Sequence, residues 1–152
     1  MNIKEKFDQL LQEFGAHVGI EHLRTSDEGV CTLSIDGRLL LNFLVNPNDG
    51  TLIVWCLLGE VSPADRSDKL AALLRANLFW HETGGATLSL MPDSDDAVLA
   101  IRYPLADIDA ERLQAITEQM VEQAEHFMNM LERAAPEVTV ELHPHSDHAI
   151  RV

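Results

Sequence analysis

The fold is decided by residues 70–90, LAALLRANLFWHETGGATLSL, in which an apolar helix is followed by two glycines and then by a strand. On a helical wheel of about 100° per residue, Leu70, Leu74 and Leu78 take one side and Phe79 takes the opposite one. Ala72 and Ala76 share the side of Phe79, with Leu73 and Trp80 in between. A helix that is apolar all round must be covered all round. We expect one side to lie on the protein's own sheet and the other on a second copy of the same helix.

Three helices are predicted in total. Apolar residues three and four apart predict a helix from Ile3 to the region of Gly15–Gly19. The central helix begins at the Ser62 N-cap with Pro63 at its first position, and we expect it to end at Gly84-Gly85. The last helix begins at Asp107 or Asp109 and ends before Pro136. Its buried stripe is predicted to contain Leu113, Ile116, Met120, Phe127 and Leu131.

Five strands are predicted between these helices. Three of them form an antiparallel meander, whose first turn is Asp36-Gly37 and whose second is the loop 46–50. The other two form a hairpin across the acidic turn 92–96. The strands are residues 31–35, 39–45, 52–58, 87–91 and 97–103. The order is therefore α-β-β-β-α-β-β-α, an α+β fold with three helices and a twisted, largely antiparallel sheet.

Two of the predicted strands are apolar at consecutive positions. Residues 39–45 read LLLNFLV and residues 52–58 read LIVWCLL, so we expect both faces of these strands to be covered. Three helices leave part of that surface for a partner. A disordered peptide could cover it by adding a strand to the sheet edge or by placing a helix in a groove. The alternative is that these strands are simply central in a well-packed core.

The composition is that of an acidic globular domain. The chain has 152 residues, is 46% hydrophobic, and carries a formal net charge of -14. This charge repels phosphate backbones and anionic lipids, so we expect neither nucleic acid nor membrane as a partner. The first residues lack the apolar segment of a signal peptide, and no run of about 18 apolar residues occurs. We expect a cytoplasmic protein, with Cys31 and Cys56 as buried thiols.

The block from Leu73 to Leu105 carries a family resemblance. It contains a leucine-rich helix with Ala76-Asn77-Leu78, then Thr83-Gly84-Gly85-Ala86, an acidic turn at 93–96, and Leu99-Ala100-Ile101 before Pro104-Leu105. This block resembles the type III secretion chaperones of the CesT (Tir chaperone) group, class I. In element order the resemblance covers about residues 1 to 133.

The resemblance implies a small acidic homodimer in bacterial cytoplasm. Such chaperones bind the N-terminal region of a secreted effector in extended, non-globular form, keep it soluble, and hand it to the secretion ATPase. Some members also regulate transcription through partner exchange. A second function class therefore stays open, a regulatory interaction protein of the same fold that sequesters another regulator of the secretion system.

The resemblance also implies site residues. The dimer contact would be formed by Leu73, Leu74, Asn77, Leu78, Trp80, Leu88 and Leu90. Effector contacts would come from Phe7, Leu11, Phe14, Leu41, Phe43 and Val54. The domain is expected to span residues 1–135, followed by a mobile, histidine-rich tail at 136–152.

Enzymatic alternatives have little support in the sequence. His81-Glu82 begins like a zinc-protease motif, but the position of the second histidine is Gly85. Gly84-Gly85 lacks the following Lys-Ser/Thr of a phosphate loop, and the acidic turn 93–96 lacks the ligand ladder of a calcium loop. His143, His145 and His148 could bind zinc, copper or nickel, which leaves a small enzyme or metal carrier as a third alternative. We expect no catalytic residue, no metal site and no cofactor.

Overall fold

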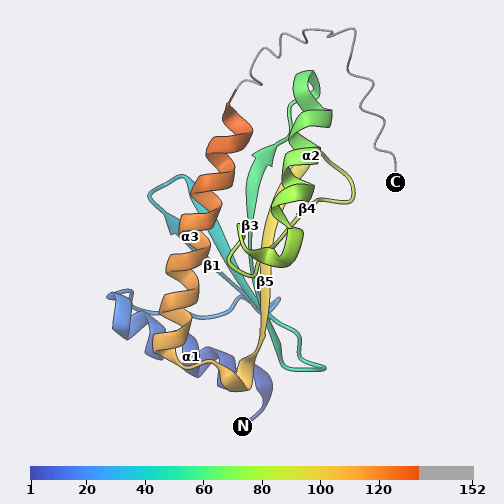
Figure 1. The fold of residues 1–152 in the computed structure, drawn as a ribbon. Helices are drawn as coiled ribbons and strands as arrows, with labels where there is room; N and C mark the ends of the chain where they lie inside the picture. Colours follow the sequence, from blue (N-terminus) through green and yellow to red (C-terminus); the bar gives the residue numbers. More distant parts are fainter. Residues whose placement is uncertain (134–152) are drawn as a thin grey trace, which may run out of the picture.

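The computed structural model describes residues 1–133, and residues 134–152 lie outside the described part of the chain. Three helices and five antiparallel strands follow one another in the predicted order (Figure 1). The helices are α1 (Ile3–Val18), α2 (Arg66–Ala76) and α3 (Ala110–Glu132). The strands are β1 (Val30–Ile35), β2 (Leu39–Val45), β3 (Thr51–Glu60), β4 (Thr87–Leu90) and β5 (Asp96–Pro104), and short 3-10 turns lie at Pro63–Asp65, Leu78–Trp80 and Leu105–Asp107.

The strands form one sheet in the order β1-β2-β3-β5-β4. The predicted meander and the predicted hairpin are both present, and pairing of β3 with β5 joins them. Asp36 and Gly37 both have positive φ, 53° and 66°, as a type I′ hairpin turn requires. The two edges of the sheet are therefore β1 and β4.

Helix α1 begins and ends with local signals that the sequence contains. The Asn2 side chain accepts a hydrogen bond from the Glu5 N–H at 2.8 Å, and the Glu5 carboxylate accepts one from the Asn2 N–H at 3.1 Å. This reciprocal pair satisfies two backbone donors that a helix start leaves open. At the other end Gly19 adopts the left-handed conformation, with φ 76°, that commonly terminates a helix.

Helix α3 confirms the one-sided stripe. Asp109 caps it by accepting from the Arg112 N–H at 2.7 Å, and all five predicted stripe residues are buried. Helices α1 and α3 contact each other, and they pack on strands β2 and β3 respectively (Figure 1). None of the helices within residues 1–133 is both long enough and apolar enough to cross a membrane.

The central helix ends earlier than predicted. We expected it to continue to Gly84-Gly85, but α2 stops at Ala76. Phe79 and Trp80 have positive φ, 53° and 56°, and so turn the chain out of the helix. The all-round apolar wheel is therefore wrong beyond Ala76, since the aromatic residues leave the helix axis.

The prediction that β2 and β3 are covered on both faces is also wrong for the protomer. Burial alternates along both strands, as expected for a sheet with one packed face. Leu40 on β2 is 58% exposed and Leu57 on β3 is 45% exposed. The reason is that α1 and α3 pack on the face that carries Phe43 and Val54, which are fully buried.

Both cysteines are buried free thiols, as predicted. Burial raises the pKa of the Cys56 thiol to about 12, and burial together with the nearby Asp8 carboxylate raises the pKa of Cys31. Both therefore stay protonated at neutral pH, when only the thiolate is a good nucleophile.

We predict that the native protein resists iodoacetamide at pH 8.5 at both thiols. Unfolding returns each thiol to an ordinary pKa near 8.5, so modification should accelerate at least about 10-fold in denaturant. Mass spectrometry after timed alkylation measures this. Rapid modification of Cys56 in the native protein would contradict its burial in the core.

Candidate functional site

The structure places all six residues expected to contact an effector inside the core. Their exposed fractions are 0–1%, and Phe14 packs against Phe43 with ring centroids 6.2 Å apart. They join α1 to the inner face of the sheet and offer no surface to a partner. The expectation must be corrected for a physical reason: an apolar stripe marks a packed face, and here that face is packed internally. The six are Phe7, Leu11, Phe14, Leu41, Phe43 and Val54.

The seven residues expected at a dimer contact fall into two groups. Leu73 and Leu88 are buried within the protomer, and Leu90 and Asn77 are partly buried. Leu74, Leu78 and Trp80 are exposed, and Phe79, which we did not include, is exposed as well. Leu74, Leu78, Phe79 and Trp80 will be called the α2 apolar patch. Leu74 is 72% exposed and Phe79 is 71% exposed, so the patch is open to solvent.

The backbone beneath the α2 apolar patch is strained. Two consecutive aromatic residues, Phe79 and Trp80, occupy the left-handed region, which non-glycine residues rarely adopt. Such strain costs on the order of 1–3 kcal/mol per residue and clusters at functional positions.

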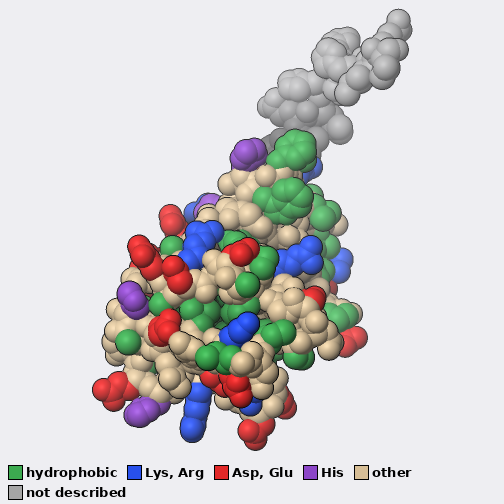
Figure 2. Space-filling model, turned by 90° about the horizontal axis from the view of Figure 1, so that it is seen from below, with side chains coloured by type: hydrophobic (Ala, Val, Ile, Leu, Met, Phe, Trp, Pro, Cys, Tyr) green, Lys and Arg blue, Asp and Glu red, His purple; other side chains and the backbone are tan. Residues whose placement is uncertain are grey.

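Figure 2 shows large hydrophobic side chains gathered at the upper end of one face, with acidic side chains around its lower rim.

Asn77 closes the β4 edge of the sheet. Its Nδ2 donates to the Leu88 carbonyl at 3.0 Å, and its Oδ1 accepts from the Leu88 N–H at 2.8 Å. The carboxamide thus makes the two hydrogen bonds that another strand would make, and it does so from the end of α2. Because both backbone groups of Leu88 are already hydrogen-bonded, the β4 edge cannot accept a further strand at this residue.

The β1 edge is closed only at Val30, whose N–H donates to Ser26 Oγ at 3.4 Å, and within residues 1–133 no comparable partner meets Thr32 or Ser34. The Val30 carbonyl accepts from the Ser26 N–H at 2.8 Å, which shows that Val30 points its backbone groups away from β2. Because these groups alternate in direction along an antiparallel strand, Thr32 and Ser34 point theirs outward too. The sequence of β1, VCTLSI, contains neither charge nor proline, the residues that usually protect an edge. Sequence reasoning missed this site, since only the strand order identifies β1 as an edge.

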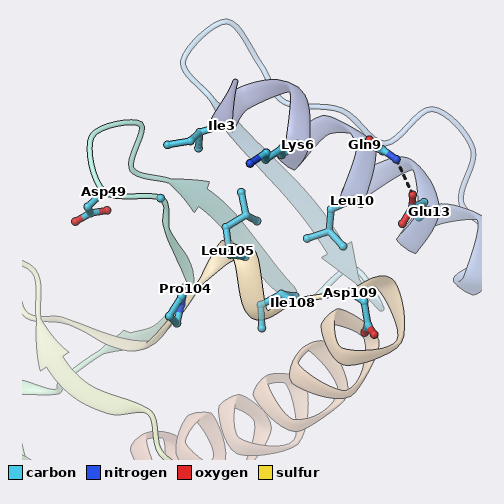
Figure 3. A pocket seen from close by; sticks show the side chains of 12 residues that line it. Ile3, Lys6, Gln9, Leu10, Glu13, Asp49, Pro104, Leu105, Ile108 and Asp109 are labelled. Atoms are coloured by element: carbon cyan, nitrogen blue, oxygen red, sulfur yellow. Dashed lines mark hydrogen bonds between the residues drawn. The ribbon is translucent and has the colours of Figure 1, made fainter. Parts of the chain in front are cut away.

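A groove of about 600 Å³ lies between α1 and the segment that joins β5 to α3. In Figure 3, Leu10 of α1 and Leu105 of this segment point toward one another across it, while Lys6, Glu13, Asp49 and Asp109 lie around it. A smaller hollow of about 160 Å³ shares Ile3 with the groove and extends to Gly29, the residue before β1. The groove and the hollow thus follow α1 and end at the residue that precedes β1.

The donor atoms needed for metal chemistry do not come together in the described residues. Across residues 1–133, no group of three or more His, Cys, Asp or Glu side chains could hold a metal ion. The predicted histidine cluster of the tail lies outside this range. What the described surface presents is a partly open strand edge, grooves lined by apolar and charged side chains, and an exposed aromatic patch, which are features of polypeptide recognition.

Comparison with known proteins agrees with this reading. A model of the Tir chaperone protein (CesT) family matches residues 9–128. The chain belongs to this family. A Tir chaperone from Escherichia coli O157:H7 is 27% identical over 129 residues, which is 85% of this chain and 81% of the relative. One from Citrobacter freundii is 26% identical over the same shares.

Solved structures show the same CesT-type fold. The ExsC–ExsE complex matches with a TM-score of 0.74 at 20% identity, over 89% of this chain and 100% of that one. The Yersinia pestis type III secretion chaperone SycH, in complex with a fragment of YscM2, matches with a TM-score of 0.65 at 22% identity, over 80% and 98%. The predicted resemblance and the α+β fold class are thus confirmed.

The two hydrogen bonds between the Asn77 side chain and the backbone of Leu88 lead to a stability prediction. Replacing Asn77 with Ala leaves the N–H and the carbonyl of Leu88 without their partners in a partly buried place, so we expect a loss of about 1–3 kcal/mol in the free energy of unfolding. Urea denaturation measures it. Asn77→Asp keeps the acceptor for the N–H but loses the donor, and its charge faces a carbonyl, so it should also destabilise. An Asn77→Ala protein as stable as the parent would contradict a stabilising role for these two hydrogen bonds.

Proposed function

We propose that this protein is a type III secretion chaperone that binds the N-terminal region of a secreted effector in extended form and keeps it soluble. The observation that carries the proposal is the open β1 edge beside grooves that follow α1. Family membership supports it, and the HopA1–SchA structure, which shares the fold, is a chaperone–effector complex. We place the protein in bacterial cytoplasm, where an effector must be held before export.

Main-chain pairing explains how one surface can hold an unfolded client. The outward backbone groups of Thr32 and Ser34 offer hydrogen bonds to any extended segment, whatever its side chains. Selectivity would come from apolar side chains of the client that enter the hollow near Gly29 and the groove at Leu10 and Leu105. Ordering a disordered client costs about 2–5 kcal/mol, so a contact that extends from the edge into both grooves is required.

The strong negative charge supports solubility of the complex. With a formal net charge of -14, copies of the chaperone repel one another while they carry apolar client segments. The same charge disfavours nucleic acid and anionic membranes as partners. We propose no catalytic role for any residue, and transfer of the client to the secretion ATPase would follow binding.

The α2 apolar patch is proposed as the contact of a homodimer. A two-fold axis would place this patch against its own copy, which covers Leu74, Leu78, Phe79 and Trp80 at once. Burial of large aromatic side chains at such a contact also offsets the backbone strain at Phe79 and Trp80. The buried Leu73 and Leu88 would then support the patch from inside the protomer rather than touch the partner.

The proposal is tested by co-expression with secreted proteins encoded close to this chain. Size-exclusion chromatography should show a stable complex that keeps the secreted protein's N-terminal segment soluble. Recovery of a transcriptional regulator in place of a secreted protein would favour the regulatory alternative. A complex that requires the folded domain of the secreted protein, and not its N-terminal segment, would contradict the proposal.

We predict that Ser34→Pro weakens client binding about 10-fold, which corresponds to the roughly 1.4 kcal/mol of one lost hydrogen bond. Proline removes the outward N–H without removing a bond of the β1–β2 ladder. Isothermal titration with the co-purified N-terminal segment measures the affinity. Ser34→Ala keeps the N–H and is the matched control. Equal affinity of both variants would exclude the β1 edge as the docking strand.

We further predict that Leu74→Asp converts a dimer into a monomer or an aggregate, because it places a charge in the α2 apolar patch. Sedimentation velocity measures the mass. Leu40→Asp, which changes an exposed leucine on the sheet face away from α2, should leave the dimer intact. A dimer that survives Leu74→Asp would refute this contact.

A further inference from the structure

The chain that follows α2 holds the α2 apolar patch in a conformation that its own residues do not favour. Residues 77–85, which lead from α2 toward β4, will be called the α2–β4 turn. Within it Phe79 and Trp80 have φ of 53° and 56°, the left-handed region that aromatic residues rarely adopt. Residues in this region persist only where surrounding contacts hold them. The contacts of the α2–β4 turn therefore decide how the patch is presented.

Part of the α2–β4 turn is held by its own groups. The Trp80 N–H donates to the Asn77 carbonyl at 3.1 Å, and the Trp80 carbonyl accepts from the Gly85 N–H at 3.1 Å. The Thr83 hydroxyl donates to the same Trp80 carbonyl at 3.4 Å, and Thr83 is buried. These bonds close the turn on itself, but none of them fixes it to another helix.

Gln119 of α3 fixes the turn from outside. Its Nε2 donates to the Gly84 carbonyl at 3.1 Å, although the two residues are 35 positions apart in the sequence. Among the side-chain hydrogen bonds of residues 1–133, this is the one that joins the α2–β4 turn to α3. The bond is partly buried, so a Gly84 carbonyl that lost this donor would be only partly solvated.

Gly84 leaves the room that the Gln119 side chain occupies. A Cβ at position 84 would collide with Gln119 Nε2 and would lie 3.2 Å from Gln119 Cδ. Gly84 also has φ 61°, which glycine adopts at no steric cost. The α2–β4 turn thus has a residue without a side chain at the point where the carboxamide arrives. The hydrogen bond and the missing Cβ belong to one contact.

The α2–β4 turn has an alternative conformation when this contact is lost. Its apolar periodicity predicts a helix that continues through residues 77–83. In such a helix Phe79 points away from the side that carries Leu74 and Leu78. The α2 apolar patch would then be divided between two sides of the helix.

We propose that Gln119 is the positioning residue of the dimer contact. Its hydrogen bond to Gly84 favours the turned state of residues 77–85 over the helical one, and the turned state presents Phe79 and Trp80 to a second copy. The inference rests on the homodimer proposed above and names a residue on which that contact depends. Because α3 also packs on β3, association of two protomers depends on the placement of α3 on the sheet.

The dissociation constant of the dimer, measured by sedimentation equilibrium on the full chain, tests this role. Gln119→Glu keeps the shape of the side chain but points a carboxylate at the Gly84 carbonyl, so we expect the dissociation constant to rise at least about 10-fold. Gln114→Glu is the matched control, since it adds the same charge to α3 at a side chain that donates to Glu118 of the same helix. Its dissociation constant should stay within about 2-fold of the parent.

Two further measurements separate positioning from a general loss of stability. Hydrogen-exchange mass spectrometry, at a dilution where the proteins are monomeric, should show exchange at least about 10-fold faster in residues 77–85 of Gln119→Glu and unchanged exchange in β3. Gly84→Ala should also weaken the dimer. Adding Gln119→Glu to Gly84→Ala should weaken it no further, because the contact is already lost.

The outcomes distinguish this inference from the dimer itself. Equal dissociation constants of the parent and Gln119→Glu, or equal weakening by Gln119→Glu and Gln114→Glu, would overturn the role of Gln119 and leave the dimer in place. Faster exchange throughout β3 in Gln119→Glu would show a general loss of the fold and would also overturn it. A parent that is monomeric at every concentration would overturn the proposed dimer, and this inference with it.

Discussion

The requirement that every backbone N–H and carbonyl of a sheet finds a partner governs this molecule. The structure meets it differently at its two edges. At β4 one side-chain carboxamide, that of Asn77, satisfies both groups of Leu88. At β1 Ser26 satisfies both groups of Val30, whereas the outward groups of Thr32 and Ser34 have no such partner among the described residues. This difference between the edges is the basis of our proposal that a client adds to β1.

The placement of the helices has a related consequence. Helices α1 and α3 pack on one face of the sheet and bury its most apolar residues in the core (Figure 1). The opposite face keeps leucines such as Leu40 and Leu57 exposed, and α2 exposes a further patch. An acidic chain can tolerate this much open apolar surface because copies repel one another. Stability thus resides in the one-sided core, and the recognition that we propose would use the edge and the patch that the core leaves open.

Much of the fold could be predicted from the sequence because its signals are local. Each of these patterns depends on residues that lie close together in the sequence. They are the apolar stripes of α1 and α3, the Asp36-Gly37 turn and the alternation along the strands. The end of α2 could not be read in this way, since it depends on a bond from Asn77 to a residue beyond the next turn. The effector residues were misplaced for a similar reason. Apolarity predicts that Phe14 or Val54 is buried, but it does not predict whether the protein's own core or a partner covers the side chain. The β1 edge emerges only from the long-range pairing of β3 with β5.

The central claim, that an extended effector segment adds to β1, is tested most directly by isotope-filtered NMR of the chaperone bound to a secreted N-terminal segment. The account predicts cross-strand contacts from the Thr32 and Ser34 amides to α-protons of the bound segment, at the short distances of paired strands. Contacts confined to the open sheet face or to the α2 apolar patch, with no signal at β1, would contradict it.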